Sequence, residues 1–465
     1  MILPEIFLRR MASILDEKFD QFQQSFDNDI ATTIRINPAK FRDQPLLKPV
    51  GFCHTGFVVP VRPIFTIDPF IHSGVYYVQE SSSMFLEQAI KQVVTKPDLR
   101  VLDLCAAPGG KSTHLASLLA KDSLLVSNDV IRSRGQILSE NIKKWGNANV
   151  IVTNNDPHDF QRLPGFFDLV VIDAPCSGEG LFRRDENAVS QWSPENAQLC
   201  AQRQRRILAD VWPTLREGGM LIYSTCTFNP SENEENIKWL SEFADIEPVS
   251  LTLDHQWGVT LTDAGGFPCY RFYPHIVEGE GFFMAVVRKK GESGLPQPKR
   301  SKDNPLLASK AEKETGRTFL LDERQDVLRF GDSLLAFPTV HLSDLLQIKN
   351  NLRIIHAGVK IGELKQKVLI PAHELALSTI LDRGKFPEID LTIGEAITYL
   401  KRDDIMPLST QKGWNLITYR KVPLGWVKNL GNRFNSAYPK EWRIRMSVSE
   451  FLEERLKTEI AKFPL

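Results

Sequence analysis

The stretch VLDLCAAPGGKS at residues 101–112 decides the fold. An apolar, strand-like run ends at Leu104, small residues and two glycines follow, and a helical pattern begins at Lys111. Small residues let a ligand approach the backbone closely, and the first turn of a helix offers N–H groups that have no partner inside the helix. The stretch therefore predicts a strand, a ligand-binding loop and a helix in immediate succession.

Two known phosphate-binding loops are alternatives for this turn. Gly110, Lys111 and Ser112 match the end of the P-loop pattern Gly-x-x-x-x-Gly-Lys-Ser, but Cys105 stands where the first glycine is required. The dinucleotide pattern Gly-x-Gly-x-x-Gly is absent from the loop as well. A tight turn without a ligand is the remaining alternative, and the motifs further along the chain argue against it.

Short apolar segments alternate with helical patterns on both sides of this loop. Strands are expected at 100–104, 124–129, 150–152, 168–173 and 220–225, and helices at 111–120, 132–145, 195–215 and 231–243. Such alternation is typical of an α/β protein with a mostly parallel, doubly wound sheet. Ligands of these sheets bind at the carboxyl ends of the strands.

Two acidic residues end the strands that follow the loop. Asp129 lies about 20 residues downstream of it, where a carboxylate can accept hydrogen bonds from ribose hydroxyls, and Asp156 follows the third strand beside the place expected for an adenine. Either residue alone would more often cap a loop. Together with the loop, they predict a cofactor that contains a nucleoside.

Two cysteines lie at the ends of the fourth and fifth strands. DAPCSG at 173–178 contains Cys176, and STCT at 224–227 contains Cys226, so both thiols are expected at the same edge as the loop. A pair made of a nucleophile and a helper thiol is the preferred interpretation, because the Cys-x-x-Cys spacing of a thioredoxin-type redox site is absent. The remaining cysteines outside the loop are expected to be inert buried residues, namely Cys53, Cys200 and Cys269.

These motifs resemble the signature set of the RNA cytosine-C5 methyltransferases. The set comprises 103–111, 173–178 and 224–227, and the run YVQESSS at 77–83 resembles the segment that precedes the family's core. The resemblance implies S-adenosylmethionine as cofactor, on a class I Rossmann-like methyltransferase core. The flanking regions are similar to those of the bacterial 16S ribosomal RNA methyltransferases of the F type (RsmF), which implies a target cytosine in the decoding region of 16S ribosomal RNA.

The resemblance also implies a cofactor site. The loop that would hold the methionine end consists of Cys105, Ala106, Ala107, Pro108, Gly109, Gly110 and Lys111. Asp129 matches the acid that binds the ribose and Asp156 the acid on the adenine side. Asp173 matches the acid that faces the cofactor and holds the target base.

Catalytic roles follow from the same match. Cys226 takes the place of the family nucleophile, Cys176 that of the thiol that assists product release, and Asp173 would stabilise the base. Cytosine C5 is a poor nucleophile, and addition of a thiolate to C6 makes it reactive. Thr227 stands where the family often has serine, and it keeps the hydroxyl. A base inside a duplex cannot reach a thiol, so it must be flipped out or single-stranded, with Arg134, Arg183 and Arg184 as candidates for phosphate contacts.

The chain is divided into several expected units. They are an α+β module at 1–90, the core at 91–290, a linker at 291–305, a small mixed domain at 306–385, and a β-rich module resembling a PUA domain, with a tail, at 386–465. Residues 412–445 hold eight basic residues against Glu441, a net charge of +7, interleaved with six aromatic residues. This composition favours RNA binding, although about two in three of the aromatics are expected in the core of the module.

The composition of the chain bounds its class. Its 465 residues carry 57 basic and 57 acidic side chains, so a uniformly basic nucleic-acid binder is excluded. No apolar run reaches the ~20 residues of a membrane span, and the N-terminus has no secretory pattern. The six cysteines lack the spacing of a zinc site, which favours a reducing cytoplasm and no metal.

We expect a monomer that binds 16S ribosomal RNA or the small ribosomal subunit. The alternatives are a transfer-RNA methyltransferase, an RNA-binding assembly protein with an idle fold, and a P-loop ATPase.

Overall fold

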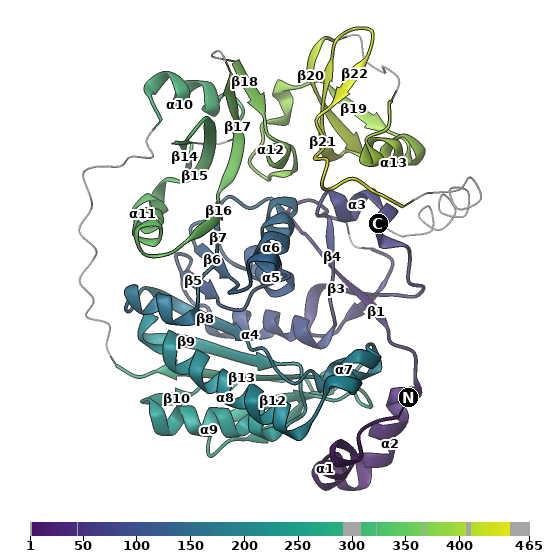
Figure 1. Cartoon of the computed structure of the whole chain (residues 1–465), viewed down its shortest axis with the longest axis vertical. Helices are drawn as coiled ribbons and strands as arrows, with labels where there is room; N and C mark the ends of the chain where they lie inside the picture. Colours follow the sequence, from purple (N-terminus) through teal and green to yellow (C-terminus); the bar gives the residue numbers. More distant parts are fainter. Residues whose placement is uncertain are drawn as a thin grey trace.

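The computed structural model describes residues 2–43, 45–291, 308–321, 323–365, 368–405 and 411–446. The described residues form one large sheet and three smaller sheets, arranged as Figure 1 shows. Residues 292–305 of the expected linker and 447–465 of the expected C-terminal module lie outside the described residues.

The large sheet contains the five strands that the alternating pattern predicts. They are β5 (Arg100–Asp103), β6 (Leu124–Asn128), β7 (Val150–Thr153), β8 (Phe167–Asp173) and β9 (Leu215–Thr225). These strands are parallel and lie in the order β7-β6-β5-β8-β9. The strand order therefore reverses between β5 and β8, and the carboxyl ends on either side of such a switch point form the usual ligand crevice. The expected α/β class is confirmed.

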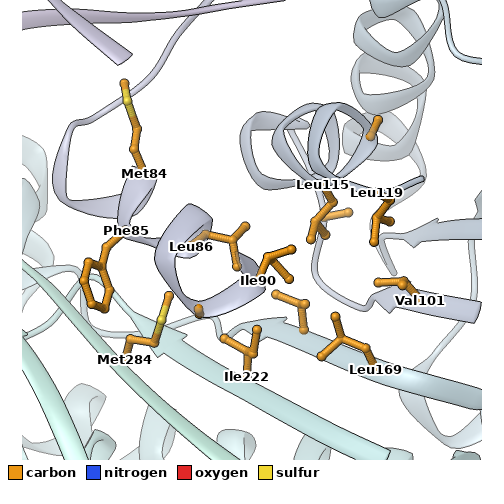
Figure 2. Packing of buried hydrophobic residues seen from close by; sticks show 14 of the residues in the cluster. Met84, Phe85, Leu86, Ile90, Val101, Leu115, Leu119, Leu169, Ile222 and Met284 are labelled. Atoms are coloured by element: carbon orange, nitrogen blue, oxygen red, sulfur yellow. The ribbon is translucent and has the colours of Figure 1, made fainter. Parts of the chain in front are cut away.

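Helices cover both faces of this sheet because adjacent strand residues point to opposite sides. Val101 packs with α4 (Leu86–Val93), α5 (Gly110–Leu118) and α6 (Arg132–Trp145) in one core cluster, and Figure 2 shows part of that packing. Leu102 belongs to the other cluster, with α8 (Pro194–Val211) and α9 (Glu234–Phe243). Burial on both faces explains the unbroken apolar character of the strands.

Antiparallel strands extend both edges of the parallel sheet. On one side lie β13 (Phe282–Lys289), β12 (Pro268–Phe272) and β11 (Thr260–Asp263), with β10 (Ile246–Pro248) beside β13. On the other side β16 (Ile354–Ala357) pairs with β7 (Figure 1). The region expected as a separate mixed domain thus supplies a strand to the central sheet, which covers the exposed edge of β7. No sequence pattern indicated this pairing.

The N-terminal module combines short helices with a four-stranded antiparallel sheet. Its helices are α1 (Glu5–Leu15), η1 (Asp16–Lys18), α2 (Phe19–Gln24), η2 (Ser25–Asp27), η3 (Phe65–Ile67), α3 (Pro69–His72) and η4 (Ser82–Phe85), and its strands are β1 (Thr32–Ile36), β2 (Lys48–Val50), β3 (Cys53–Val59) and β4 (Tyr76–Val78). Apolar residues recur every three or four positions from Phe7 to Phe26, a spacing that is typical of one continuous amphipathic helix. The structure instead turns at Asp16, whose φ of +49° interrupts the helix, so Phe7 and Phe22 come from separate helices.

Beyond the linker the chain forms two further sheets. The first, β14 (Gln325–Phe330), β15 (Ser333–Pro338), β17 (Val359–Lys365) and β18 (Val368–Pro371), is flanked by α10 (Lys310–Arg317), α11 (Leu342–Asn351) and α12 (His373–Leu377). The second consists of β19 (Glu388–Leu391), β20 (Gly413–Tyr419), β21 (Val422–Asn429) and β22 (Phe434–Ser436), with α13 (Ile393–Lys401). Its core is continuous with that of the N-terminal module, where Phe70 packs against Tyr419.

The last module bears out the expectation for its aromatic residues. The four buried ones are Tyr419, Trp426, Phe434 and Tyr438, whereas Trp414 and Trp442 are half-buried. All eight basic side chains of residues 412–445 are exposed. Within the described residues, no helix is both long and apolar enough to span a membrane.

Candidate active site

The glycine-rich loop lies between β5 and α5 and is held by helix α6. Gly109 caps α5 with a φ of +119°, a conformation that favours glycine. The side chain of Asn141 donates to the carbonyl of Pro108 over 2.8 Å, and that of Arg134 donates to the carbonyl of Ala107 over 2.6 Å. Arg134, expected at RNA phosphates, therefore binds the loop in this structure.

A buried carboxyl group that the sequence did not single out lies directly before the loop. Asp103 ends β5 and accepts a hydrogen bond from Ser112 over 2.6 Å, and Ser112 also contacts Ser127 over 2.8 Å. The other carboxyl oxygen of Asp103 is buried without a hydrogen-bond partner. Burial raises the pKa of Asp103 to about 7, so the carboxyl group that joins β5, α5 and β6 below the loop is protonated at mildly acidic pH.

The two acids expected on the nucleoside side lie at the ends of β6 and β7. Asp129 is buried, accepts from the backbone N–H of Ile131 over 2.9 Å and lies 3.7 Å from Arg134. Asp156 caps the short helix η5 (Pro157–Arg162), and its carboxylate pairs with Arg206 over 2.7 Å. The structure thus links Asp129 to the loop through Arg134, whereas Asp156 is bound by α8.

The two cysteines expected at one edge are in contact. Cys176 follows β8, Cys226 follows the adjacent strand β9, and their Sγ atoms lie 3.3 Å apart. All six cysteines are free thiols. The hydrogen bond with Cys226, together with burial, raises the pKa of Cys176 well above its usual value. Cys176 therefore holds its proton more tightly than an isolated cysteine does.

An ion pair connects the loop to the strand that carries Cys176. The ammonium of Lys111 lies 2.8 Å from a carboxylate oxygen of Asp173, and the hydroxyl of Ser224 donates to the other oxygen over 3.0 Å. Burial disfavours the charged form of Lys111, but the Asp173 carboxylate outweighs this effect and raises the pKa of Lys111. A fixed cation and a fixed anion thus lie where β5, β8 and β9 end.

Comparison with known proteins gives the chain a family. The model of the 16S rRNA methyltransferase RsmB/F matches residues 92–288, that of the N-terminal domain of RsmF matches 3–81, and that of the RsmF PUA domain matches 386–444. Ribosomal RNA small subunit methyltransferase F from Shigella boydii serotype 4 (strain Sb227) is 30% identical over 94% of this chain and 96% of its own. The chain belongs to the RsmF family. The protein of that name from Escherichia coli (strain SE11) has the same identity and coverage.

Solved structures support the methyltransferase fold of this RsmF-family chain. A methyltransferase homolog from Pyrococcus horikoshii is 29% identical, has a TM-score of 0.53, and covers 62% of this chain and 95% of its own. NSun6 from Pyrococcus horikoshii, solved with SFG, is 20% identical with a TM-score of 0.53, over 62% of this chain and 99% of its own. The latter likeness concerns the fold alone.

The site of this RsmF-family chain also contains two buried glutamates that no sequence pattern indicated. Glu232, in η8 (Pro230–Glu232), accepts from the backbone N–H of Ser177 over 2.8 Å and from the hydroxyls of Ser177 and Thr227. Glu179 lies three residues after Cys176 and is also fully buried. Burial raises the pKa of Glu232. Its acidic surroundings in the sequence resembled a solvated charged run, so burial was the missing signal.

A cleft of about 810 Å³ lies beside η6 (Glu179–Arg183), the short helix that begins with Glu179. Arg62, Arg183 and Arg184 line it, together with residues 28–32 of the N-terminal module. Arg183 donates to the carbonyls of Gly279 and Asn28 over 2.8 and 3.2 Å, and Arg184 pairs with Glu280. Arg183, which was expected at phosphates, therefore also joins the core to the N-terminal module, whereas the ion pair of Arg184 lies within the core.

One cluster among the described residues has the composition of a metal site. Cys53, Glu87 and His114 are buried within reach of one another. The Glu87 carboxylate already accepts from the Cys53 thiol over 3.1 Å, and from Lys91 and the backbone N–H of His54. These bonds make the cluster a neutralised hydrogen-bond network, and the expected absence of a metal stays a prediction.

Proposed function

We propose that this protein transfers a methyl group from S-adenosylmethionine to C5 of one cytosine in the decoding region of 16S ribosomal RNA, through a covalent bond between Cys226 and C6. Members of its family are S-adenosylmethionine-dependent ribosomal RNA methyltransferases. The observation that carries the proposal is the contact of Cys176 and Cys226 over 3.3 Å, beside the pair of Lys111 and Asp173. An idle RNA-binding fold would have no need of two thiols in contact at the switch point.

The residues at this edge fit the cofactor. Residues 105–111 would hold its methionine end, where small side chains leave the backbone approachable and Lys111 is fixed by its ion pair. Asp129 would bind the ribose hydroxyls, Asp156 would lie on the adenine side, and Asp173 would face the methyl group. When bound, the cofactor supplies an electrophilic methyl group.

The nucleophile is the Cys226 thiolate. The thiolate adds to C6 and moves electron density toward N3 and C5 of the ring. The Asp173 carboxyl group, held in place by Ser224 and Lys111, would accept a hydrogen bond from the exocyclic amine and, in its protonated form, would donate one to N3 as charge develops there. The ammonium of Lys111 also lies close enough to Cys226 for the two groups to interact electrostatically.

Product release needs a base that becomes available after the first step. Once Cys226 is bonded to C6 it carries no negative charge, so the interaction that raises the pKa of Cys176 is removed. Cys176 can then lose its own proton to solvent, and the resulting thiolate can accept the proton from C5, directly or through a water molecule. Loss of that proton restores the C5–C6 double bond and expels the thiolate of Cys226.

The target base reaches these thiols only when it is single-stranded or flipped out of a duplex. The cleft lined by Arg62, Arg183 and Arg184 provides cations for the neighbouring phosphates, and the exposed basic residues of 412–445 provide a second contact. The partner is 16S ribosomal RNA or the small subunit. The protein acts as a monomer in the cytoplasm without a metal, and a reducing compartment keeps both thiols free.

Mass spectrometry of nucleosides tests this function. The purified protein and deuterium-labelled S-adenosylmethionine are incubated in three separate reactions. One contains naked 16S ribosomal RNA, one contains small subunits and one contains total transfer RNA. Labelled 5-methylcytidine in either ribosomal sample is the expected result. Label in transfer RNA alone favours the alternative substrate, and no labelled 5-methylcytidine in any sample overturns the proposal.

A further inference from the structure

The segment that carries the nucleophile is held by the two residues that open η6 (Glu179–Arg183). The backbone N–H of Gly180 donates to the carbonyl of Cys226 over 2.9 Å, and the backbone N–H of Phe228 donates to the Glu179 carboxylate over 3.2 Å. A Cβ atom at Gly180 would lie 2.8 Å from the Cys226 carbonyl oxygen, so this approach requires glycine. The position of Cys226 thus depends on where Glu179 is held.

Glu179 is held by a residue near the N-terminus of the chain. The guanidinium of Arg10, in helix α1, lies 2.6 Å from its Oε1, and the indole N–H of Trp192 donates to the same oxygen over 3.0 Å. The Glu179 side chain is fully buried and that of Arg10 is 24% exposed. The guanidinium also lies over the rings of Phe7 and Trp192. Arg10 therefore has one fixed position.

Aromatic packing also connects helices α1 and α2 with the segments that follow Cys176 and Cys226. Phe7 of α1 contacts Phe182, six residues after Cys176, with ring centroids 5.2 Å apart. Phe22 of α2 contacts Phe228, two residues after Cys226, at 5.3 Å. The first two helices of the chain therefore support the residues that follow each thiol.

Stability alone does not account for an ion pair in this place. Desolvation of two charges consumes most of their attraction, and well-packed apolar side chains of similar volume stabilise a fold equally well or better. A carboxylate at position 179 has a further use, because it accepts the backbone N–H of Phe228 while its charge is compensated by Arg10. The pair is suited to fixing a backbone.

We infer that Arg10 and Glu179 are positioning residues that keep Cys226 in line with Cys176, so that the N-terminal helix is part of the catalytic apparatus. This inference rests on the proposed function. Misplacement of a reacting atom by about 1 Å can cost on the order of 100-fold in rate. Loss of the pair should therefore lower the rate of the chemical step, whereas S-adenosylmethionine, which binds on the β5–β6 side, should bind as before.

The test compares Arg10→Gln with Arg9→Gln, a matched control whose side chain is 77% exposed and pairs with Glu5. For Arg10→Gln we expect kcat to fall by about 10- to 100-fold with an unchanged Kd for S-adenosylmethionine, and Arg10→Lys should recover part of the loss. Urea unfolding shows whether each variant is folded. A folded Arg10→Gln protein with a kcat within twofold of Arg9→Gln overturns the inference.

A second readout needs no RNA and separates this inference from the proposed function. Diamide oxidises two adjacent thiols to a disulfide and takes up their two protons and two electrons, which converts it to its reduced hydrazine form. The rate at which the disulfide between Cys176 and Cys226 forms depends on the geometry of the two thiols, and mass spectrometry follows it. We expect a rate at least threefold slower in Arg10→Gln and Arg10→Lys than in Arg9→Gln, even if the wild type proves inactive on ribosomal RNA. Equal rates in all three variants contradict the positioning role.

Discussion

The Sγ atoms of Cys176 and Cys226 lie 3.3 Å apart at the ends of the adjacent parallel strands β8 and β9. The contact brings together two thiols separated by 50 residues in the sequence. This contact, together with burial, raises the pKa of Cys176, which suits the role proposed for Cys176 in product release rather than that of the nucleophile. Replacing one thiol should therefore have a different consequence from replacing the other.

Cys226→Ala should abolish methyl transfer, because the substitution removes the thiol that adds to C6. Binding of S-adenosylmethionine, measured by calorimetry, should remain, since the loop at 105–111 is unchanged. Cys200→Ala, a substitution of a buried thiol in α8, is the control and should keep its activity. Full turnover by Cys226→Ala would exclude it as the nucleophile.

Cys176→Ala should trap the enzyme on its RNA. The Cys226 adduct would still form, but the C5 proton would have no base to accept it and the bond to C6 would persist. A denaturing gel should show a protein band retarded by covalently attached RNA. If this variant released methylated RNA at the wild-type rate, Cys176 would have no part in release.

Asp173→Asn should slow methyl transfer by about 100- to 1,000-fold, the usual effect of removing one electrostatic contact to a developing charge. The substitution also removes the partner of Lys111. Asp245→Asn is a suitable control, because Asp245 is exposed and pairs with Lys290 at the surface. Single-turnover rates that are equal for both variants would argue against a role of Asp173 at the base.

Asp103 should make stability fall as the pH rises. Its pKa is about 7 in the folded state and near 4 in the unfolded chain, so between these values the folded state holds one more proton. Its contribution is fully present below pH 4 and is lost as the pH rises through 7, by at most about 1.4 kcal/mol per unit. Asp103→Asn should remove this decline.

Urea unfolding at pH 5 and pH 8 measures the effect. Other buried groups titrate in the same range, but they are common to both proteins and cancel in the comparison. The difference in the free energy of unfolding between the two pH values should be smaller in Asp103→Asn than in the wild type. An equal difference in both proteins would show that Asp103 does not titrate there.

The sequence was sufficient for those site residues that follow the ends of strands. Apolar segments located β5, β6, β8 and β9, and because parallel strands end at one edge, Cys176 and Cys226 were expected on the same side of the sheet. The fold class and the alternating helices followed from the same pattern. The contact distance and the ion pair of Lys111 with Asp173 required the structure.

Residues that act through tertiary contacts gave no such signal. Arg10 and Glu179 are 169 residues apart, and Glu232 lies in a run of acids that a sequence alone presents as solvated. Strand β16 is only four half-buried residues long, too short for a periodic pattern. The break at Asp16 depends on a single backbone angle, which the apolar spacing on either side does not encode.

Bisulfite sequencing of total RNA from a strain that lacks this protein, complemented with either the wild type or Cys226→Ala, tests the proposed reaction most directly. We expect one 5-methylcytosine of 16S ribosomal RNA to disappear in the deletion strain, to return with the wild type and to stay absent with Cys226→Ala. An unchanged 16S pattern together with the loss of a transfer-RNA site would contradict it.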